Sequence, residues 1–142
     1  MVKTIKQISL FSENKPGRLA KVADTLGNIN VNIRAFTIAE SGDFGIIRIV
    51  VDQPDIAHEA LKKAGFTVSE TDVLGIEITD KPGGLRDIAA VLEEGNINID
   101  YAYAFIGRKQ NAILIVRVSD LDKAVNYLKG KNLKLLGIED LA

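Results

Sequence analysis

Residues 15–19 read Lys-Pro-Gly-Arg-Leu, and residues 81–85 read Lys-Pro-Gly-Gly-Leu. With no gap in this alignment, Asn-Val-Asn-Ile at 30–33 falls on Asn-Ile-Asn-Ile at 96–99. Over the 25 aligned positions that begin at Lys15 and Lys81, nine residues are identical. Because the same register continues through a predicted helix into the following strand, the sequence predicts two copies of one unit.

The two copies, 1–70 and 71–142, share a predicted order of elements. A strand leads into the Pro-Gly turn, and a helix follows with apolar residues at i, i+3, i+4 and i+7, ending near Gly27 and Gly95. The order β-α-β-β-α-β, twice, predicts an α+β fold of two ferredoxin-like sandwiches with antiparallel sheets packed side by side. The later elements are expected at 31–39, 44–51, 54–63 and 66–68, then at 97–106, 111–118, 120–129 and 133–136, with turns at 41–43 and 107–109.

Local chemistry predicts how these helices begin. Asn14 is expected to cap the first helix, because its side-chain oxygen can accept from a free backbone N–H. Pro16 is tolerated beside it, since the missing N–H has no intrahelical partner there. Asp120 is expected to cap the last helix. The apolar spacing predicts that Leu19 and Leu85 lie in the core.

Composition excludes several classes of protein. Of the 142 residues, 46% are hydrophobic and 26% charged, and the formal net charge is −1. Such a chain lacks the basic surplus of proteins that bind nucleic acids or anionic membranes. The absence of cysteine excludes disulfides, thiolate metal sites and cysteine nucleophiles. With no long apolar run and no signal-peptide pattern at its start, the sequence predicts a cytoplasmic protein.

Catalysis is not expected either. The single histidine, His58, is expected on the polar face of a helix, and no second histidine or cysteine completes a nitrogen–sulfur metal site. The acidic pairs at 93–94 and at 120 and 122 are interpreted as solvated helix faces and caps, not as acid–base pairs. The sequence therefore predicts no catalytic residue, no metal ion and no cofactor.

An aromatic stripe in the second copy leaves one alternative to weigh. The same element order builds RNA-binding modules, which stack bases on aromatic side chains of the sheet. Tyr101, Tyr103 and Phe105 alternate along one strand, but without a basic surplus they are interpreted as core or subunit interface. The strands at 46–51 and 112–118 are apolar on both faces, whereas helices cover only one face. We therefore expect a homodimer through the sheet faces.

The Lys-Pro-Gly-x-Leu turn, the helix Leu-x-x-Val-Ala-x-x-Leu and the Asn-Ile strand together resemble the ACT domain. The resemblance covers nearly the whole chain, once in each copy. ACT domains are small βαββαβ modules that bind amino acids and regulate metabolic enzymes, and most are fused to a catalytic domain. The resemblance thus implies a free-standing tandem ACT protein, with an amino acid held at the strand 1–helix 1 turns at the interface between units.

The chemistry of the turn agrees with this implied role. A glycine turn at a helix N-terminus offers free N–H groups and the positive end of the helix dipole, which suit an α-carboxylate. Asn14 and Asp80 stand where they can accept from an ammonium group, and Asn32 and Asn98 are expected to offer amides from the neighbouring unit. The expected ligand-binding residues are Asn14, Pro16, Gly17, Arg18, Leu19, Asn32, Ile33, Asp80, Pro82, Gly83, Gly84, Leu85, Asn98 and Ile99.

The two copies differ at these positions. Arg18 aligns with Gly84, and Asn14 aligns with Asp80, so we predict two non-equivalent sites. In an alternative interpretation, the Pro-Gly turns only shape the chain. The protein is then a ligand-free structural or regulatory partner subunit of a metabolic enzyme.

Overall fold

The computed structural model describes residues 3–107 and 110–141, so the predicted turn at 107–109 lies partly outside the described residues. The chain divides into two compact units. We call Lys6–Thr71 the first unit; the second unit contains the rest of the described chain, from Asp72 onward, together with residues 3–5. Residues 3–5 therefore pack with a unit whose other residues begin about 70 positions later, at Asp72.

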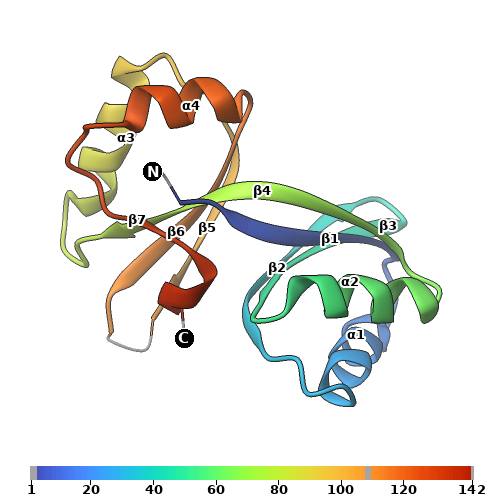
Figure 1. The fold of residues 1–142 in the computed structure, drawn as a ribbon. Helices are drawn as coiled ribbons and strands as arrows, with labels where there is room; N and C mark the ends of the chain where they lie inside the picture. The colour runs from blue at the N-terminus through green and yellow to red at the C-terminus, as the bar shows by residue number, and fades with distance from the viewer. Residues whose placement is uncertain (1–2, 108–109, 142) are drawn as a thin grey trace. The chain divides into compact units, whose positions relative to one another are not determined.

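The first unit is a four-stranded sheet with two helices. Its strand order is β2-β3-β1-β4, and the pairings of β3 with β1 and β2 are antiparallel, with Leu10 opposite Ile47 and Ile38 opposite Ile47. Both helices lie on one face of this sheet (Figure 1). The elements are β1 (Ile5–Glu13), α1 (Arg18–Gly27), β2 (Ile33–Ser41), β3 (Phe44–Val51), α2 (Pro54–Lys63) and the beginning of β4 (Thr67–Ile78).

The second unit repeats this plan, with the remainder of β4 as its first strand. The order is β5-β6-β4-β7, and each of these pairings is antiparallel. β4 therefore ends one unit and begins the next without a break. The other elements are α3 (Gly84–Glu94), β5 (Ile99–Ile106), β6 (Ala112–Val118), α4 (Leu121–Leu128), β7 (Leu135–Leu136) and a short 3-10 helix, η1 (Ile138–Leu141).

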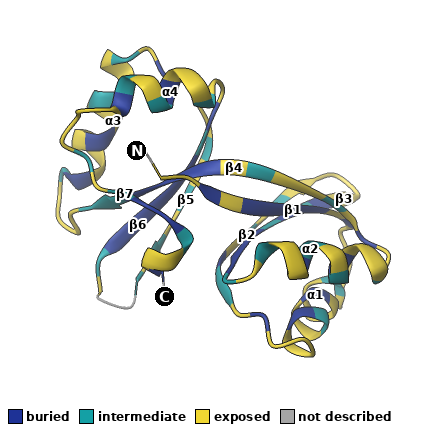
Figure 2. Ribbon diagram, viewed as in Figure 1, coloured by how far each residue is buried: buried dark blue, intermediate teal, exposed yellow. Residues whose placement is uncertain are grey.

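The two hydrophobic cores use equivalent positions, which confirms the predicted repeat. The inward side of each helix is buried and the outward side is exposed (Figure 2). In both units the first helix buries an apolar pair four residues apart, Val22 with Leu26 and Ile88 with Leu92. The cores contain Ile8, Leu10, Val22, Leu26, Val31, Ile47, Ile49, Val51, Ala57 and Leu61 in the first unit, and Leu74, Ile76, Ile88, Leu92, Ile97, Leu114, Val116, Val118, Ala124 and Leu128 in the second.

Two expectations about the helix starts are wrong. Leu19 and Leu85 are 38% and 57% exposed, because the buried part of each apolar stripe begins only one turn later. Asn14 does not cap α1; the N-cap is Gly17, in the left-handed conformation with φ +90°, and no described side chain caps the helix. The expected cap of α4 is confirmed, since the Asp120 carboxylate accepts from the N–H of Lys123 at 3.1 Å.

Candidate ligand-binding turns

The turn between β1 and α1 is held by backbone hydrogen bonds. The N–H of Asn14 donates to the carbonyl of Asp43 at 2.8 Å, which ties the turn to the β2–β3 hairpin. The N–H of Lys15 donates to the carbonyl of Glu13 at 3.0 Å. Gly17 completes the turn at a positive φ that a residue with a side chain adopts only at a cost. The chain can therefore enter α1 sharply, with its first N–H groups free.

The N-terminus of α1 leaves backbone donors without intrahelical acceptors. The first hydrogen bond of the helix runs from the N–H of Lys21 to the carbonyl of Gly17 at 3.0 Å. The N–H groups of residues 18–20 precede it, and such groups carry the positive end of the helix dipole. This end of the helix is suited to a carboxylate.

A pocket of about 260 Å³ opens beside this helix end, and we call it the turn pocket. Glu13 and Asn14 are among its polar lining residues, while Leu19, Ile38 and Ile47 provide an apolar wall. An α-amino acid has matching parts: a carboxylate for the N–H groups, an ammonium group for Glu13 and Asn14 and a side chain for the wall. The complete lining is Ser12, Glu13, Asn14, Lys15, Pro16, Gly17, Arg18, Leu19, Ala20, Ile38, Gly45 and Ile47.

Arg18 is one of two cations that line the turn pocket, with Lys15, and one of its hydrogen-bond donors has no partner among the described residues. Its Nη2 lies 3.5 Å from Glu13 Oε1, while Lys15 Nζ lies 3.3 Å from Glu13 Oε2. Its Nε is buried and has no hydrogen-bond acceptor among the described residues. A guanidinium offers five donors, and a buried donor without a partner is destabilising. The guanidinium of Arg18 can therefore donate a further hydrogen bond to an anion.

The second turn has the same backbone but a different covering. Gly83 has φ +89°, almost the value at Gly17. A Cβ built on Gly83 would come within 2.8 Å of Arg86 Nη2, whereas one built on Gly17 would meet nothing within 4 Å. The position aligned with Arg86 is Ala20, which lines the turn pocket. The side chain of Arg86 thus folds over the second turn, and the small Ala20 leaves the first one open.

Gly84 reflects a second difference between the turns. A Cβ at Gly84 would lie 2.0 Å from the carbonyl oxygen of Thr79, so the backbone leaves no room for a side chain. The N–H of Gly84 also donates to the carbonyl of Lys81 at 3.0 Å, which occupies one donor of this helix end. Asp80, Lys81, Pro82 and Leu85 are exposed around it.

The structure does not bring the predicted asparagines to the turn of their own unit. Asn32 precedes β2, whose first residue pairs with Val51, whereas Glu13 at the turn pairs with Phe44 at the other end of β3. The N–H of Asn32 donates to Asp52 Oδ1 at 3.0 Å, and Ile33 packs against the core. In the second unit, Asn98 donates to Ser119 Oγ at 3.0 Å and to Asp100 Oδ1 at 3.3 Å, and together with Ile99 it lines another cavity. Their role toward a neighbouring unit stays a prediction.

Comparison with protein families identifies these units. A family model described as "ACT domain pair" matches residues 3–142. The chain belongs to the ACT domain family. A search of curated proteins found no match to this chain.

Several solved structures are similar to this chain. A protein from Bacteroides thetaiotaomicron shares 41% identity, with 99% of this chain and 96% of that chain covered and a TM-score of 0.90. The regulatory subunits of aspartate kinase from Thermus thermophilus and Thermus flavus each share 16% identity. The alignment with the Thermus thermophilus subunit covers 90% of each chain at a TM-score of 0.67. The alignment with the Thermus flavus subunit covers 91% of this chain and 90% of that chain at a TM-score of 0.64. At that identity, the likeness to the kinase subunits is one of fold.

Sequence reasoning found five residues of the turn pocket in this first ACT unit but missed the part of its apolar wall that comes from the strands. Asn14, Pro16, Gly17, Arg18 and Leu19 were predicted, but Ile38 and Ile47 enter from strands that only the sheet register places there. Ala20 was also missed. Its signal was present in the aligned repeats, where a small residue stands opposite Arg86.

The described residues of the ACT pair were also searched for metal sites and membrane-spanning helices. Within 3–107 and 110–141, no group of three or more His, Asp or Glu side chains is placed to hold a metal ion. No helix in the same part of the chain is long and apolar enough to cross a membrane. His58 is partly buried, with its Nδ1 3.7 Å from Glu70 Oε1 and 3.8 Å from Glu59 Oε1.

Proposed function

We propose that this ACT domain pair is a non-catalytic regulatory protein of amino-acid metabolism, and that its ligand is an amino acid held at the turn of the first unit. The main support is the N-terminus of α1, which has no side-chain cap in the described part of the chain and lies beside the turn pocket. The guanidinium of Arg18 lines the same pocket, and its Nε has no hydrogen-bond acceptor among the described residues. In this arrangement the α-carboxylate accepts from the N–H groups of the first turn of α1.

The other groups of the ligand have counterparts in the same pocket. Its ammonium group donates to Glu13 or Asn14, and its side chain packs against Leu19, Ile38 and Ile47. Because this wall is apolar, we expect preference for an amino acid with an aliphatic or other apolar side chain. Binding favours the conformation in which Arg18 and the turn are ordered, and this bias is what a partner enzyme senses.

A thermal-shift screen of the twenty amino acids tests this proposal. A ligand that binds only the folded state raises its apparent stability, by about 2.7 kcal/mol at a hundredfold excess over Kd. We expect one or two amino acids to raise Tm, and Ala20→Arg to abolish that response without lowering the Tm of the free protein. If none of the twenty shifts Tm, the ligand-free partner-subunit alternative is favoured.

The association state is a separate proposal. We infer a homodimer through the sheet faces, a metabolic enzyme as partner and a cytoplasmic location. Light scattering at micromolar concentration tests the dimer, and a clean monomer mass would contradict it.

A further inference from the structure

A second cavity of the first unit shares one side chain, Arg18, with the turn pocket but has a different lining. Its volume is about 310 Å³, and it extends from the end of β1 to the connection between α2 and β4. We call it the phenyl pocket because three phenylalanines contribute to it. The lining is Phe11, Ser12, Glu13, Arg18, Lys21, Phe44, Gly65, Phe66 and Thr67.

The phenyl rings of this pocket are unusually accessible. Phe11 and Phe44 are 50% and 58% exposed, whereas Phe66 is buried against the core. Exposed aromatic surface costs free energy in water, and rings prefer to pack against another flat apolar group at a centroid separation of about 4.5–7 Å. The pocket therefore offers exposed aromatic surface against which a flat apolar group can pack.

Positive charge accompanies these rings. Lys21 Nζ lies 5.1 Å from the centroid of the Phe66 ring, a cation–π distance. The Arg18 guanidinium contributes an Nε that has no acceptor in the described chain. Glu13 is the one carboxylate in the lining, so two cations and one anion leave a net positive charge. A ligand that fits this lining carries an anionic group on a flat aromatic body.

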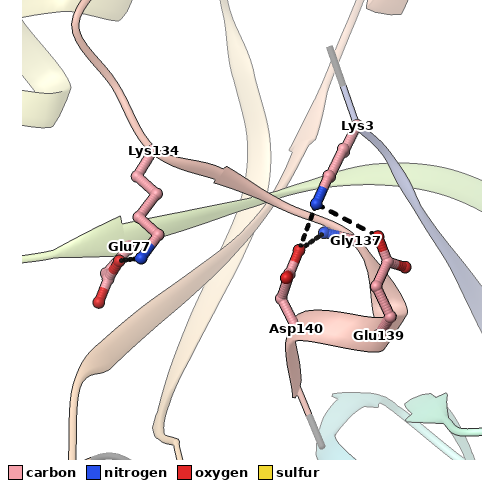
Figure 3. A network of polar contacts seen from close by, with 6 residues as sticks. All are labelled: Lys3, Glu77, Lys134, Gly137, Glu139 and Asp140. Atoms are coloured by element: carbon pink, nitrogen blue, oxygen red, sulfur yellow. Dashed lines mark hydrogen bonds and ion pairs between the residues drawn. The ribbon is translucent and has the colours of Figure 1, made fainter. Parts of the chain in front are cut away.

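The second unit has a cavity at the same place in the fold, with the opposite character. It measures about 410 Å³, and the repeat alignment places Glu77 opposite Phe11, Gly84 opposite Arg18 and Asp87 opposite Lys21. Its one cation is already paired, since Lys134 Nζ lies 3.0 Å from Glu77 Oε2 (Figure 3), and Asn111 Nδ2 donates to Glu77 Oε1 at 2.9 Å. The fold thus produces the cavity twice, but of the two only the first is lined by phenyl rings and by two cations.

We propose that the phenyl pocket is a binding site for a small aromatic carboxylate, distinct from the amino-acid site at the turn. The carboxylate pairs with Lys21 and with the guanidinium of Arg18, and the ring packs between Phe11 and Phe44. The ligand needs no ammonium group. The proposal does not rest on the amino-acid function, although Arg18 couples the two sites because it lines both.

Titration with phenylacetate, followed by two-dimensional NMR of backbone amides, tests this site. We expect saturable shifts at Phe11, Lys21, Phe44 and Thr67. Acetate lacks the ring and benzyl alcohol lacks the charge, so each is expected to bind at least about fivefold more weakly, the factor that corresponds to about 1 kcal/mol. Equal binding of all three probes, or no saturable shift with phenylacetate, would overturn the proposal.

Variants locate the binding. Lys21→Gln and Phe44→Ala change exposed side chains of the pocket, and each is expected to weaken phenylacetate binding about fivefold. The matched controls are Asp87→Asn, at the position of Lys21 in the second unit, and Phe36→Ala, an exposed ring outside the pocket. Both controls are expected to bind like the wild type. If the controls weaken binding as much as the pocket variants, the assigned site is wrong.

One further variant separates this site from the amino-acid site. Ala20→Arg fills the turn pocket but does not line the phenyl pocket. Phenylacetate binding that survives Ala20→Arg supports two distinct sites. Loss of both phenylacetate and amino-acid binding in that variant would show one shared site and overturn the proposal.

Discussion

The first turn of the first unit and that of the second have the same Lys-Pro-Gly backbone and different surroundings. Gly17 and Gly83 share φ within a degree, yet the space above Gly17 is open and that above Gly83 holds the guanidinium of Arg86. The deciding position lies three residues beyond the glycine, where Ala20 aligns with Arg86. The same motif can therefore have an open or a covered surface, depending on a residue outside the motif.

The largest expected effect tests whether the two cores are equivalent. Leu26 and Leu92 are buried at aligned positions, so Leu26→Ala and Leu92→Ala should each lower the free energy of unfolding by about 2–5 kcal/mol in urea titrations. Leu19→Ala and Leu85→Ala, about two turns earlier, should cost less than about 1 kcal/mol because Leu19 and Leu85 keep 38% and 57% of their surface exposed. A large cost at Leu19 would contradict the exposed first turn.

Exchange of the residues after the glycines is expected to have a smaller, asymmetric effect. Gly84→Arg places a side chain against the carbonyl of Thr79 and should lower the free energy of unfolding by about 1–3 kcal/mol. The reverse change, Arg18→Gly, meets no such obstacle and should cost about 1 kcal/mol or less. Urea unfolding of both variants measures the difference, and equal costs would mean that the two turns tolerate side chains alike.

Exchange of Ala20 and Arg86 tests directly whether an arginine side chain over the turn blocks ligand binding. Ala20→Arg should weaken binding of the strongest responder among the amino acids at least about tenfold, which corresponds to about 1.4 kcal/mol. Arg86→Ala should leave that affinity unchanged, because its site lies on the other turn. Isothermal titration calorimetry measures both. Undiminished binding in Ala20→Arg would remove the turn pocket as the amino-acid site.

The smallest effect concerns a charge network of the second unit. The pKa of Asp140 is lowered from its usual value near 3.8 (Figure 3). The larger cause is a hydrogen bond from the N–H of Gly137, and the second is a hydrogen bond from the ammonium group of Lys3. Because the folded-state pKa is lowered, this stabilisation is present above that value and is lost as pH falls through the folded-state pKa. Asp140→Asn should therefore flatten the acid limb of the stability profile slightly, as measured by urea unfolding between pH 2 and 5.

Lys3 titrates in the opposite direction. Hydrogen bonds to Asp140 and Glu139, at 2.9 and 3.3 Å, raise the pKa of Lys3 above 10.5. Its contribution is complete below that value and is lost as pH rises through the raised pKa. Stability of the Lys3→Gln variant should match the wild type only at strongly alkaline pH. A wild-type acid limb in Asp140→Asn, or a wild-type alkaline limb in Lys3→Gln, would contradict the network.

The sequence predicted the fold well because the repeat constrains it twice. Periodicity gave the faces of the helices, and the aligned apolar positions became the two cores. Periodicity does not show where along a helix the layer beneath it ends, which is why Leu19 and Leu85 were misplaced. The N-cap was missed because the turn places Gly17, three residues after Asn14, at the position before the helix.

The lining of the turn pocket was predicted only in part, because the pairing register of the strands cannot be read from local sequence. The turn residues adjoin one another in the sequence, so a motif suffices to group them. Ile38 and Ile47 reach the pocket through pairing of β2 with β3, which no local pattern specifies. The placement of Asn32 was predictable in principle, because a helix that runs back along the sheet carries the chain to the opposite end before the next strand begins.

The packing of residues 3–5 with the second unit has a consequence for biosynthesis. Lys3 pairs with Asp140 across 137 residues, and Ile5 packs against Gly75, where a Cβ would lie 2.5 Å from Ile5 Cδ1. The first unit has all its strands once residue 71 has left the ribosome, so it can fold early. The second unit also contains residues 3–5, which are synthesised before the first unit, and the partner of Lys3 in that unit, Asp140, is synthesised 137 residues later. A fusion at the N-terminus should therefore disturb the unit encoded farthest from it.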